Sequence, residues 1–228
     1  MKIHKVSSLL LAVSVLFASG CSKVEEAIPA EATIRTDIVS EETTAETTAE
    51  TAETTTAETV YEPQLTSHIH IAAAGDNLIH SSLYEQAAHR ANGNGYDFAY
   101  EYDNVDDYIE SADIAILNQE TLICNDTVKP STYPRFNSPK ALGDYMIKIG
   151  FDVFTMANNH VLDKDASGLS ACLDYWDSHP EAVVLGAYRN VEDKENIRTL
   201  TEQGVTFSFL SYTEFLNGLK LPADSELV

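Results

Sequence analysis

Residues 151–160 read Phe151-Asp152-Val153-Phe154-Thr155-Met156-Ala157-Asn158-Asn159-His160, an apolar run that ends in a polar triplet. The run is typical of a buried β-strand, and the triplet follows at the point where that strand ends. An Asn-Asn-His turn in this place directs an amide oxygen and an imidazole toward one point in space. Such a point suits a metal ion or a phosphate-like group.

Two earlier apolar runs end in the same way. Residues 68–75 are followed by Asp76 and Asn77, and residues 113–117 are followed by Asn118, Gln119 and Glu120. In an open α/β sheet, ligands bind outside the carboxyl ends of the strands, so all three polar clusters would lie at one edge. The three clusters together predict a functional site at that edge.

The remaining apolar patterns predict an α/β fold. Four runs without clean alternation predict strands that are covered on both faces in a mainly parallel sheet. They are Ile69–Ala74, Ile114–Leu117, Phe151–Ala157 and Ala182–Leu185. Between Arg198 and Tyr212 the pattern predicts an antiparallel hairpin, with Glu202-Gln203-Gly204 as its turn and Val205–Leu210 as its returning strand. We therefore expect a layered α/β domain with an antiparallel addition.

Helical spacing of apolar residues predicts three helices, each of which packs one stripe onto the sheet. The second helix has Ser138 as its N-cap, Pro139 in its first position and Gly150 as its stop. The three stripes are Val105, Tyr108, Ile109 and Ala112; Leu142, Tyr145, Met146 and Ile149; and Leu169, Cys172, Leu173 and Trp176.

Residues 1–21 read as a secretory signal peptide. A basic start is followed by an apolar stretch from Leu9 to Ala18, which is too short for a typical membrane span. The stretch ends in Ala18-Ser19-Gly20-Cys21, which resembles the lipobox of bacterial lipoproteins, so we expect Cys21 to carry acyl chains. An ordinary signal peptide with a chance cysteine is the alternative. The lipobox predicts an extracytoplasmic protein that is lipid-anchored to the bacterial cell membrane.

Residues 22–66 are rich in Glu, Thr and Ala and have few large apolar side chains, which predicts a disordered tether. A helix favoured by Ala and Glu is the alternative, but Thr lowers helix propensity and there is no apolar stripe. Much of the net charge of −22 belongs to this tether. The rest of the chain is still acidic, which argues against nucleic-acid binding.

Cys124 and Cys172 are the cysteines outside the lipobox, and they are too few for a disulfide framework. One bridge between them would be compatible with an oxidising compartment. The sequence leaves the pairing open and favours two free thiols.

Four segments resemble the CapA family of capsule-synthesis and poly-γ-glutamate-associated proteins, whose domain is similar to the calcineurin-like metallophosphoesterases. The segments are residues 75–79, 112–120, 150–163 and 185–187, and their order and spacing agree over about residues 68–215. Ala157-Asn158-Asn159-His160, with Asp163 after it, is the most specific of these motifs. The resemblance implies a layered, metallophosphoesterase-like sandwich, of which residues 67–228 would be the N-terminal portion, with the domain incomplete at its C-terminus.

Carried over by resemblance, Asp76, Glu120, Asn159 and His160 look like ligands of a divalent metal such as Mn, Fe or Zn. His160 also looks like the catalytic residue that contacts the scissile group or protonates a leaving oxygen. The secondary candidates are Asn77, His80, Asn118, Asn158 and Asp163. Each of these residues has a simpler interpretation, because Asp can cap a turn, Asn can hold a loop, and a lone His is often structural or exposed.

The chain departs from the family pattern in two places. Members continue with a His-Trp-Gly-Glu-like segment and a Gly-x-His-x-His-like segment, and neither occurs in the 228 residues, so we expect half of a metal site. Gln119 also stands where the family more often has Leu.

The resemblance implies an envelope protein that assists synthesis, export or surface attachment of an anionic polymer such as poly-γ-glutamate. Its chemistry would be that of a metal-dependent hydrolase or phosphoesterase. Its partners would be the polymer or its precursor, the membrane through the lipid anchor, and membrane proteins of capsule synthesis. Two alternatives stay open: a non-catalytic surface lipoprotein that binds the polymer, and a solute-binding lipoprotein.

Overall fold

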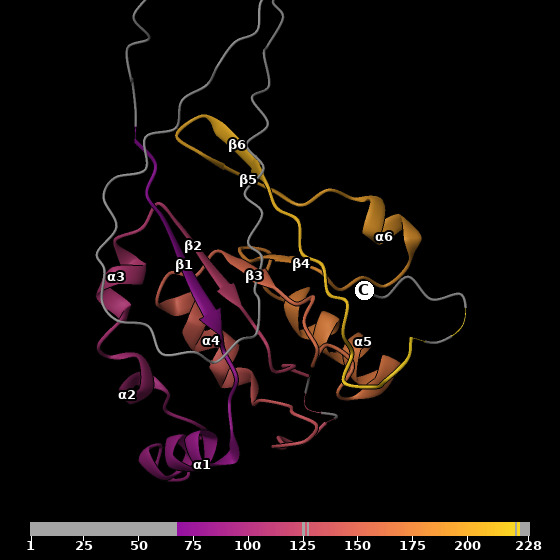
Figure 1. Cartoon of the computed structure of the whole chain (residues 1–228). Helices are drawn as coiled ribbons and strands as arrows, with labels where there is room; N and C mark the ends of the chain where they lie inside the picture. Colours follow the sequence, from indigo (N-terminus) through magenta and orange to yellow (C-terminus); the bar gives the residue numbers. More distant parts are fainter. Residues whose placement is uncertain (1–67, 125, 127, 222, 224–228) are drawn as a thin grey trace, which may run out of the picture. The chain divides into compact units, whose positions relative to one another are not determined.

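A sheet of four parallel strands organises the described part of the chain (Figure 1). The computed structural model describes residues 68–124, 126, 128–221 and 223. The sheet has the order β1-β2-β3-β4, and each strand is parallel to its neighbour. The strands are β1 (Ile71–Asp76), β2 (Ile114–Asn118), β3 (Val153–Thr155) and β4 (Val183–Leu185). The predicted α/β class with a mainly parallel sheet is confirmed.

Six helices accompany the strands in the described residues. They are α1 (Ser81–Arg90), α2 (Ala99–Tyr102), α3 (Asp106–Glu110), α4 (Lys140–Lys148), α5 (Asp165–Trp176) and α6 (Val191–Glu195). The sequence analysis did not predict α1, in which Ala87 is the one buried residue and Leu83 and Tyr84 are only partly buried against the main core. Over the described ranges, no helix is long and apolar enough to cross a membrane.

The two predicted helices that follow β2 and β3 are present. In α5 the whole predicted stripe of Leu169, Cys172, Leu173 and Trp176 is buried. The start of α4 was predicted one residue too early, because Pro139 has the extended backbone of an N-cap. Ser138 is buried and its hydroxyl bonds Thr121 Oγ1 at 2.8 Å instead of capping the helix. Gly150, with φ of +103°, follows the C-cap as predicted.

The helix predicted over residues 105–112 is shorter than expected. α3 covers Asp106–Glu110, and Ile109 is its buried residue, whereas Tyr108 is 74% exposed. A helix of five residues makes little more than one turn, so it presents a single side chain to the core. The predicted apolar stripe therefore does not form.

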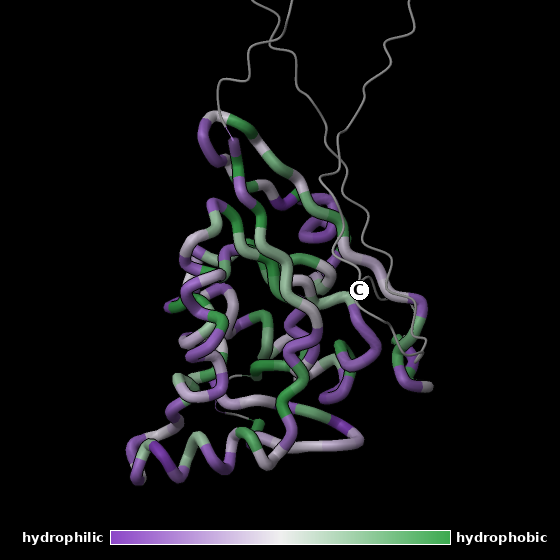
Figure 2. The backbone as a smooth tube through the Cα atoms, turned by 60° about the vertical axis from the view of Figure 1, so that its left-hand side comes forward, coloured by the Kyte–Doolittle hydropathy of each residue, from purple (hydrophilic) through white to green (hydrophobic). Residues whose placement is uncertain are grey.

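Alternate residues of the inner strands face two different layers. Ala115 and Phe154 belong to the main core together with buried side chains of α3, α4 and α5. Their neighbours Ile114 and Val153 belong to a smaller cluster on the other face. Figure 2 shows the hydrophobic residues concentrated along these strands. β2 and β3 are covered on both faces, as predicted.

An antiparallel hairpin supplies the smaller cluster with Leu200 and Phe207. It consists of β5 (Thr199–Glu202) and β6 (Val205–Ser208), with Gln203 and Gly204 at positive φ in the turn. The predicted hairpin is confirmed, but Glu202 belongs to β5 and the returning strand ends two residues before Leu210. After β6 the chain runs past β4 toward α5 (Figure 1).

β1 contradicts the expectation that every strand is covered on both faces. Ile71 is 41% exposed, and β1 contributes no buried residue to the smaller cluster. β1 lies at the edge of the sheet, and the hairpin residues of the smaller cluster pack with buried residues of β2, β3 and β4.

The described residues decide the state of two cysteines. Cys124 and Cys172 are both buried and free, so the bridge that the sequence left open is not formed. The predicted signal peptide with Cys21 and the predicted tether lie outside the described residues.

Candidate functional site at the carboxyl ends of the strands

The register of the strands places three polar residues side by side. Asp76 pairs with Asn118 across β1 and β2, and Asn118 pairs with Thr155 across β2 and β3. A register shift after Ala74 leaves Gly75 as the extra residue, a bulge that brings Asp76 into line. Asn118 Nδ2 donates to Asp76 Oδ1 at 2.7 Å. The polar clusters predicted at the ends of β1 and β2 therefore meet.

Asn158 connects the third cluster to the other two. Its Nδ2 donates to the carbonyl oxygen of Gln119 at 3.2 Å and lies 3.4 Å from Asn118 Oδ1. Its Oδ1 accepts the backbone N–H of His160 at 2.9 Å, which forms an Asx turn after β3. Asn158 thus fixes the turn that carries His160 against the end of β2.

Glu120 is buried beside a second carboxylate. The residue is 7% exposed, and its Oε2 has no hydrogen-bond partner among the described residues. Burial and the negative charge of Asp76 raise the pKa of Glu120 from 4.5 to about 7, although His160 has the opposite effect. His160 Nε2 lies 3.9 Å from Glu120 Oε1. A positive charge at this point would stabilise the ionised carboxylate.

His160 is held in place by Asp163 and Phe136. Its Nδ1 lies 2.7 Å from Asp163 Oδ2, and the backbone N–H of Phe136 donates to the same oxygen at 2.6 Å. The Phe136 ring packs edge-on against the imidazole, with ring centroids 4.9 Å apart. Because the Asp163 carboxylate favours the tautomer with its proton on Nδ1, Nε2 is left as the nitrogen nearest Glu120.

Asn77 belongs to the buried scaffold under the site. Its Nδ2 donates to Gln119 Oε1 at 2.8 Å, and its Oδ1 accepts the Tyr102 hydroxyl at 2.7 Å. Gln119 Nε2 in turn donates to the carbonyl oxygen of Thr121 at 2.7 Å. Gln119, one of the departures from the family pattern, therefore links Asn77 to Thr121 through hydrogen bonds of its side chain.

Asn159 and His80 connect to the cluster through residues that the sequence analysis did not select. Asn159 Nδ2 donates to Asn217 Oδ1 at 3.2 Å. His80 is exposed at the start of α1 and packs edge-on against Phe136, with ring centroids 5.0 Å apart. Asn217 stands before a glycine, an Asn-Gly turn signal that could have drawn attention to it, whereas Phe136 has no comparable signal in the sequence.

The residues present fit part of a cation site. Within the described ranges, no group of three or more His, Cys, Asp or Glu side chains is arranged to hold a metal ion. A neighbouring cation would nevertheless give the unpartnered oxygen of Glu120 a partner. Its positive charge would also lower the raised pKa of Glu120. Oxygen donors from Asp76 and Glu120 suit a hard divalent ion, and the His160 imidazole widens the choice to Zn²⁺ or Fe.

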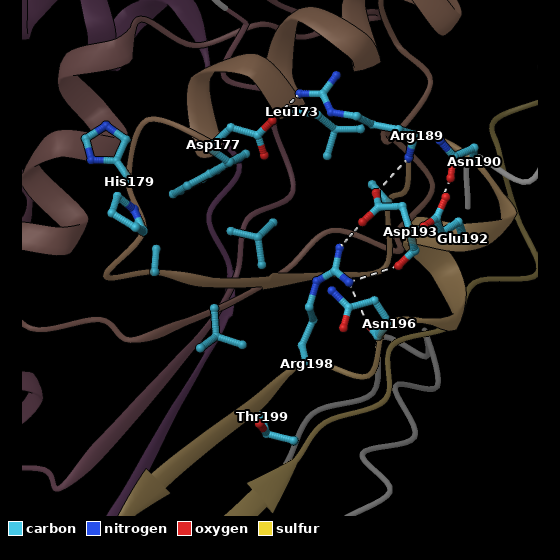
Figure 3. A pocket seen from close by; sticks show the side chains of 16 residues that line it. Leu173, Asp177, His179, Arg189, Asn190, Glu192, Asp193, Asn196, Arg198 and Thr199 are labelled. Atoms are coloured by element: carbon cyan, nitrogen blue, oxygen red, sulfur yellow. Dashed lines mark hydrogen bonds and ion pairs between the residues drawn. The ribbon is translucent and has the colours of Figure 1, made fainter.

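A cavity of about 680 Å³ lies elsewhere, beside β4 and the end of α5 (Figure 3). None of the predicted site residues lines it. Arg189 in its wall binds Asp174 at 2.9 Å and Asp177 at 2.5 Å, and Arg198 pairs with Asp193. The arginines are therefore balanced by carboxylates of the same region, and the predicted site and this cavity are separate features.

Comparison with known families identifies most of the described region. The model of a family described as bacterial capsule synthesis protein, PGA_cap, matches residues 70–226. The match includes all the predicted site residues from Asp76 to Asp163, as well as Asn217. Among curated proteins, none shows significant sequence similarity to the chain.

Proposed function

The chain belongs to the bacterial capsule synthesis protein family, and from this premise we propose that it is a lipid-anchored envelope protein with metal-dependent hydrolase chemistry. The family supports a function associated with capsule synthesis, and the α/β fold agrees with its metallophosphoesterase-like domain. The substrate class that we propose is an anionic capsular polymer such as poly-γ-glutamate, or its precursor. Membrane proteins of capsule synthesis would be further partners.

One observation carries the proposed chemistry: a buried Glu120 with an unpartnered oxygen next to Asp76. Two neighbouring carboxylates repel each other, and a divalent cation is the usual way to offset that cost. Asp76 and Glu120 would hold the cation, with the amide oxygen of Asn159 as a further ligand and His160 beside it. A bound divalent cation polarises a phosphoryl or acyl oxygen.

His160 is suited to move a proton. Asp163 keeps the ring proton on Nδ1, so Nε2 has a lone pair that can take up a proton and release it to a leaving oxygen. The short contact with Asp163 also stabilises the imidazolium that forms in between. Because Asp163 and Phe136 fix the ring, little reorganisation is needed during the transfer.

A cation would also help an acidic protein to bind an acidic polymer. The net charge of the chain is −22, so direct contact with a polycarboxylate is repulsive. Binding of the polymer should therefore depend on divalent ions and weaken when a chelator is added.

The first experiment is a calorimetric titration of the protein with Mn²⁺ and with Zn²⁺ at pH 8, where Glu120 is largely ionised. We expect binding in the wild type and its loss in Asp76→Asn and Glu120→Gln. Glu110→Gln is the matched control, because Glu110 is an exposed carboxylate of α3. Equal binding by all four proteins would place the cation elsewhere and contradict the proposal.

The absence of a three-ligand group in the described residues favours one alternative, a non-catalytic protein that binds polymer through the same site. Hydrolysis of an aryl phosphate ester and of poly-γ-glutamate, each with Mn²⁺, distinguishes the two. If the protein is a hydrolase, His160→Ala should abolish turnover while circular dichroism shows an intact fold. Polymer binding without turnover in the wild type would instead support the binding protein.

The anchor is tested separately. We propose that Cys21 is lipidated after removal of residues 1–20, which predicts a membrane-bound protein in bacteria. Mass spectrometry of the mature N-terminus should find acyl chains on Cys21, and Cys21→Ser should release the protein from the membrane fraction. An unmodified N-terminus at another residue would indicate an ordinary signal peptide.

A further inference from the structure

We infer that Asn217 is a positioning residue of the candidate site: its carboxamide fixes the orientation of the Asn159 amide and of the His160 ring. Asn217 is 58 residues beyond Asn159 in the sequence, in the segment that follows β6. The inference deepens the proposed function, because it rests on the cation site proposed there.

A tight turn presents Asn217 to the site. The backbone N–H of Leu219 donates to the carbonyl oxygen of Leu216 at 2.8 Å, and the two residues between them have positive φ, +51° for Asn217 and +77° for Gly218. Positive φ at both central positions defines a type I′ turn, for which Asn-Gly is a favoured pair. Leu216 and Leu219 pack against the main core on either side. The backbone and two apolar anchors therefore set the place of the Asn217 side chain.

The contact with Asn159 decides which end of that amide is free. Asn159 Nδ2 donates to Asn217 Oδ1 at 3.2 Å. An amide that uses its nitrogen in this way keeps both lone pairs of its Oδ1 for another partner. Cations such as Mn²⁺ are coordinated by oxygen lone pairs and not by N–H groups. An Asn159 amide with its oxygen free is therefore the orientation that a metal site requires. Outer contacts of this kind orient the ligands of many metal sites.

The same side chain also touches the imidazole. Asn217 Nδ2 lies 3.3 Å from Nδ1 and 3.4 Å from Nε2 of His160. Because Asp163 favours the ring proton on Nδ1, the amide N–H of Asn217 can donate only to Nε2. Asn217 therefore adds a contact to a ring whose other partners are Asp163 and Phe136, and it limits the rotation of that ring.

Asn217→Gly tests this role without disturbing the turn, because glycine readily adopts positive φ. Asn92→Gly is the matched control: Asn92 has φ of +55° in an exposed turn after α1. We expect the Mn²⁺ affinity measured by calorimetry to fall about tenfold to a hundredfold in Asn217→Gly and to stay unchanged in Asn92→Gly. Thermal unfolding of both variants checks that the fold is intact.

A second measurement needs no metal. In the ¹⁵N–¹H spectrum of the cation-free protein, the side-chain amide signals of Asn159 should shift in Asn217→Gly and not in Asn92→Gly. Unchanged Asn159 signals would overturn the inference, and so would shifted signals with unchanged Mn²⁺ affinity. If the wild type binds no Mn²⁺, the cation proposal fails, while the Asn159 signals still decide whether Asn217 holds that amide.

Discussion

At the scale of single residues, the site contains a buried carboxylate, Glu120, and an imidazole, His160, whose ring is held by its neighbours. Glu120 is buried next to Asp76, and its Oε2 has no hydrogen-bond partner in the described ranges. His160, by contrast, has Asp163 on one nitrogen and Phe136 against its ring. A buried carboxylate with an unpartnered oxygen destabilises the fold, whereas it provides a strong ligand once a cation is present.

Glu120→Gln should therefore stabilise the cation-free protein at high pH. The pKa of Glu120 in the fold, about 7, is above its ordinary value of 4.5, so the folded state binds more protons between these values and stability falls as pH rises through them. Each pKa unit corresponds to about 1.4 kcal/mol, and solvent screening reduces the effect, so we expect a gain of about 1–2 kcal/mol at pH 8. Urea unfolding with chelator present measures it.

At pH 4.5 the gain should vanish, because Glu120 is then mostly protonated in the folded protein. Glu110→Gln, an exposed change, should alter stability at neither pH. A Glu120→Gln variant that is less stable than the wild type at pH 8 would show that the ionised carboxylate gains more from His160 than it loses through burial and the charge of Asp76.

At the scale of elements, Gly186 is the point where the end of β4, the turn after β3 and the segment after β6 come together. A Cβ added at Gly186 would lie 2.5 Å from the backbone nitrogen of Ala157 and 2.8 Å from Ser211 Oγ, and φ is +87°. Any larger residue would push against Ala157, which directly precedes Asn158 and Asn159. The close approach of these segments thus sets the position of the site turn.

Gly186→Ala should cost about 2–4 kcal/mol in urea unfolding, from the clash and from the positive φ together. Gly204→Ala separates the two effects, since Gly204 has φ of +80° but nothing within 4 Å of an added Cβ. We expect that control to cost only about 1–2 kcal/mol. Mn²⁺ affinity should fall in Gly186→Ala alone. Equal costs for the two variants would mean that the segments around Gly186 can move apart freely.

At the scale of the whole described domain, one large core joins the sheet to α3, α4 and α5, and both free cysteines lie inside it. Cys172 is on α5, and Cys124 Sγ donates to the carbonyl oxygen of Gly168 on the same helix at 3.2 Å. Burial raises the pKa of Cys124 to about 12 and that of Cys172 further. Neither thiol is exposed or ionised enough to react while the core is closed.

In a Cys21→Ser variant, the two remaining thiols should therefore be inert to an aromatic disulfide reagent in the native protein. Both should react in urea, at a midpoint that matches unfolding followed by circular dichroism, because the core opens as one cooperative unit. Fast reaction of one thiol in buffer would reveal local opening around α5.

Sequence patterns alone determined the fold class, the strands that end in polar residues, the hairpin turn and the stripe of α5. These features follow from local rules, since apolar periodicity and turn chemistry act over a few residues. The same rules failed at α3, where the stripe of residues 105–112 is not buried, and at β1, whose exposure depends on its place at the edge of the sheet.

Only the tertiary structure decided how the polar strand ends become a site. The bulge at Gly75 aligns Asp76 with Asn118, and burial beside Asp76 changes the acidity of Glu120. The turn at Asn217 reaches Asn159 and His160, which lie 58 and 57 positions earlier in the sequence. Register, burial and contacts between distant segments are properties of the packed chain, because each depends on which surfaces meet, and no local pattern in the sequence records that.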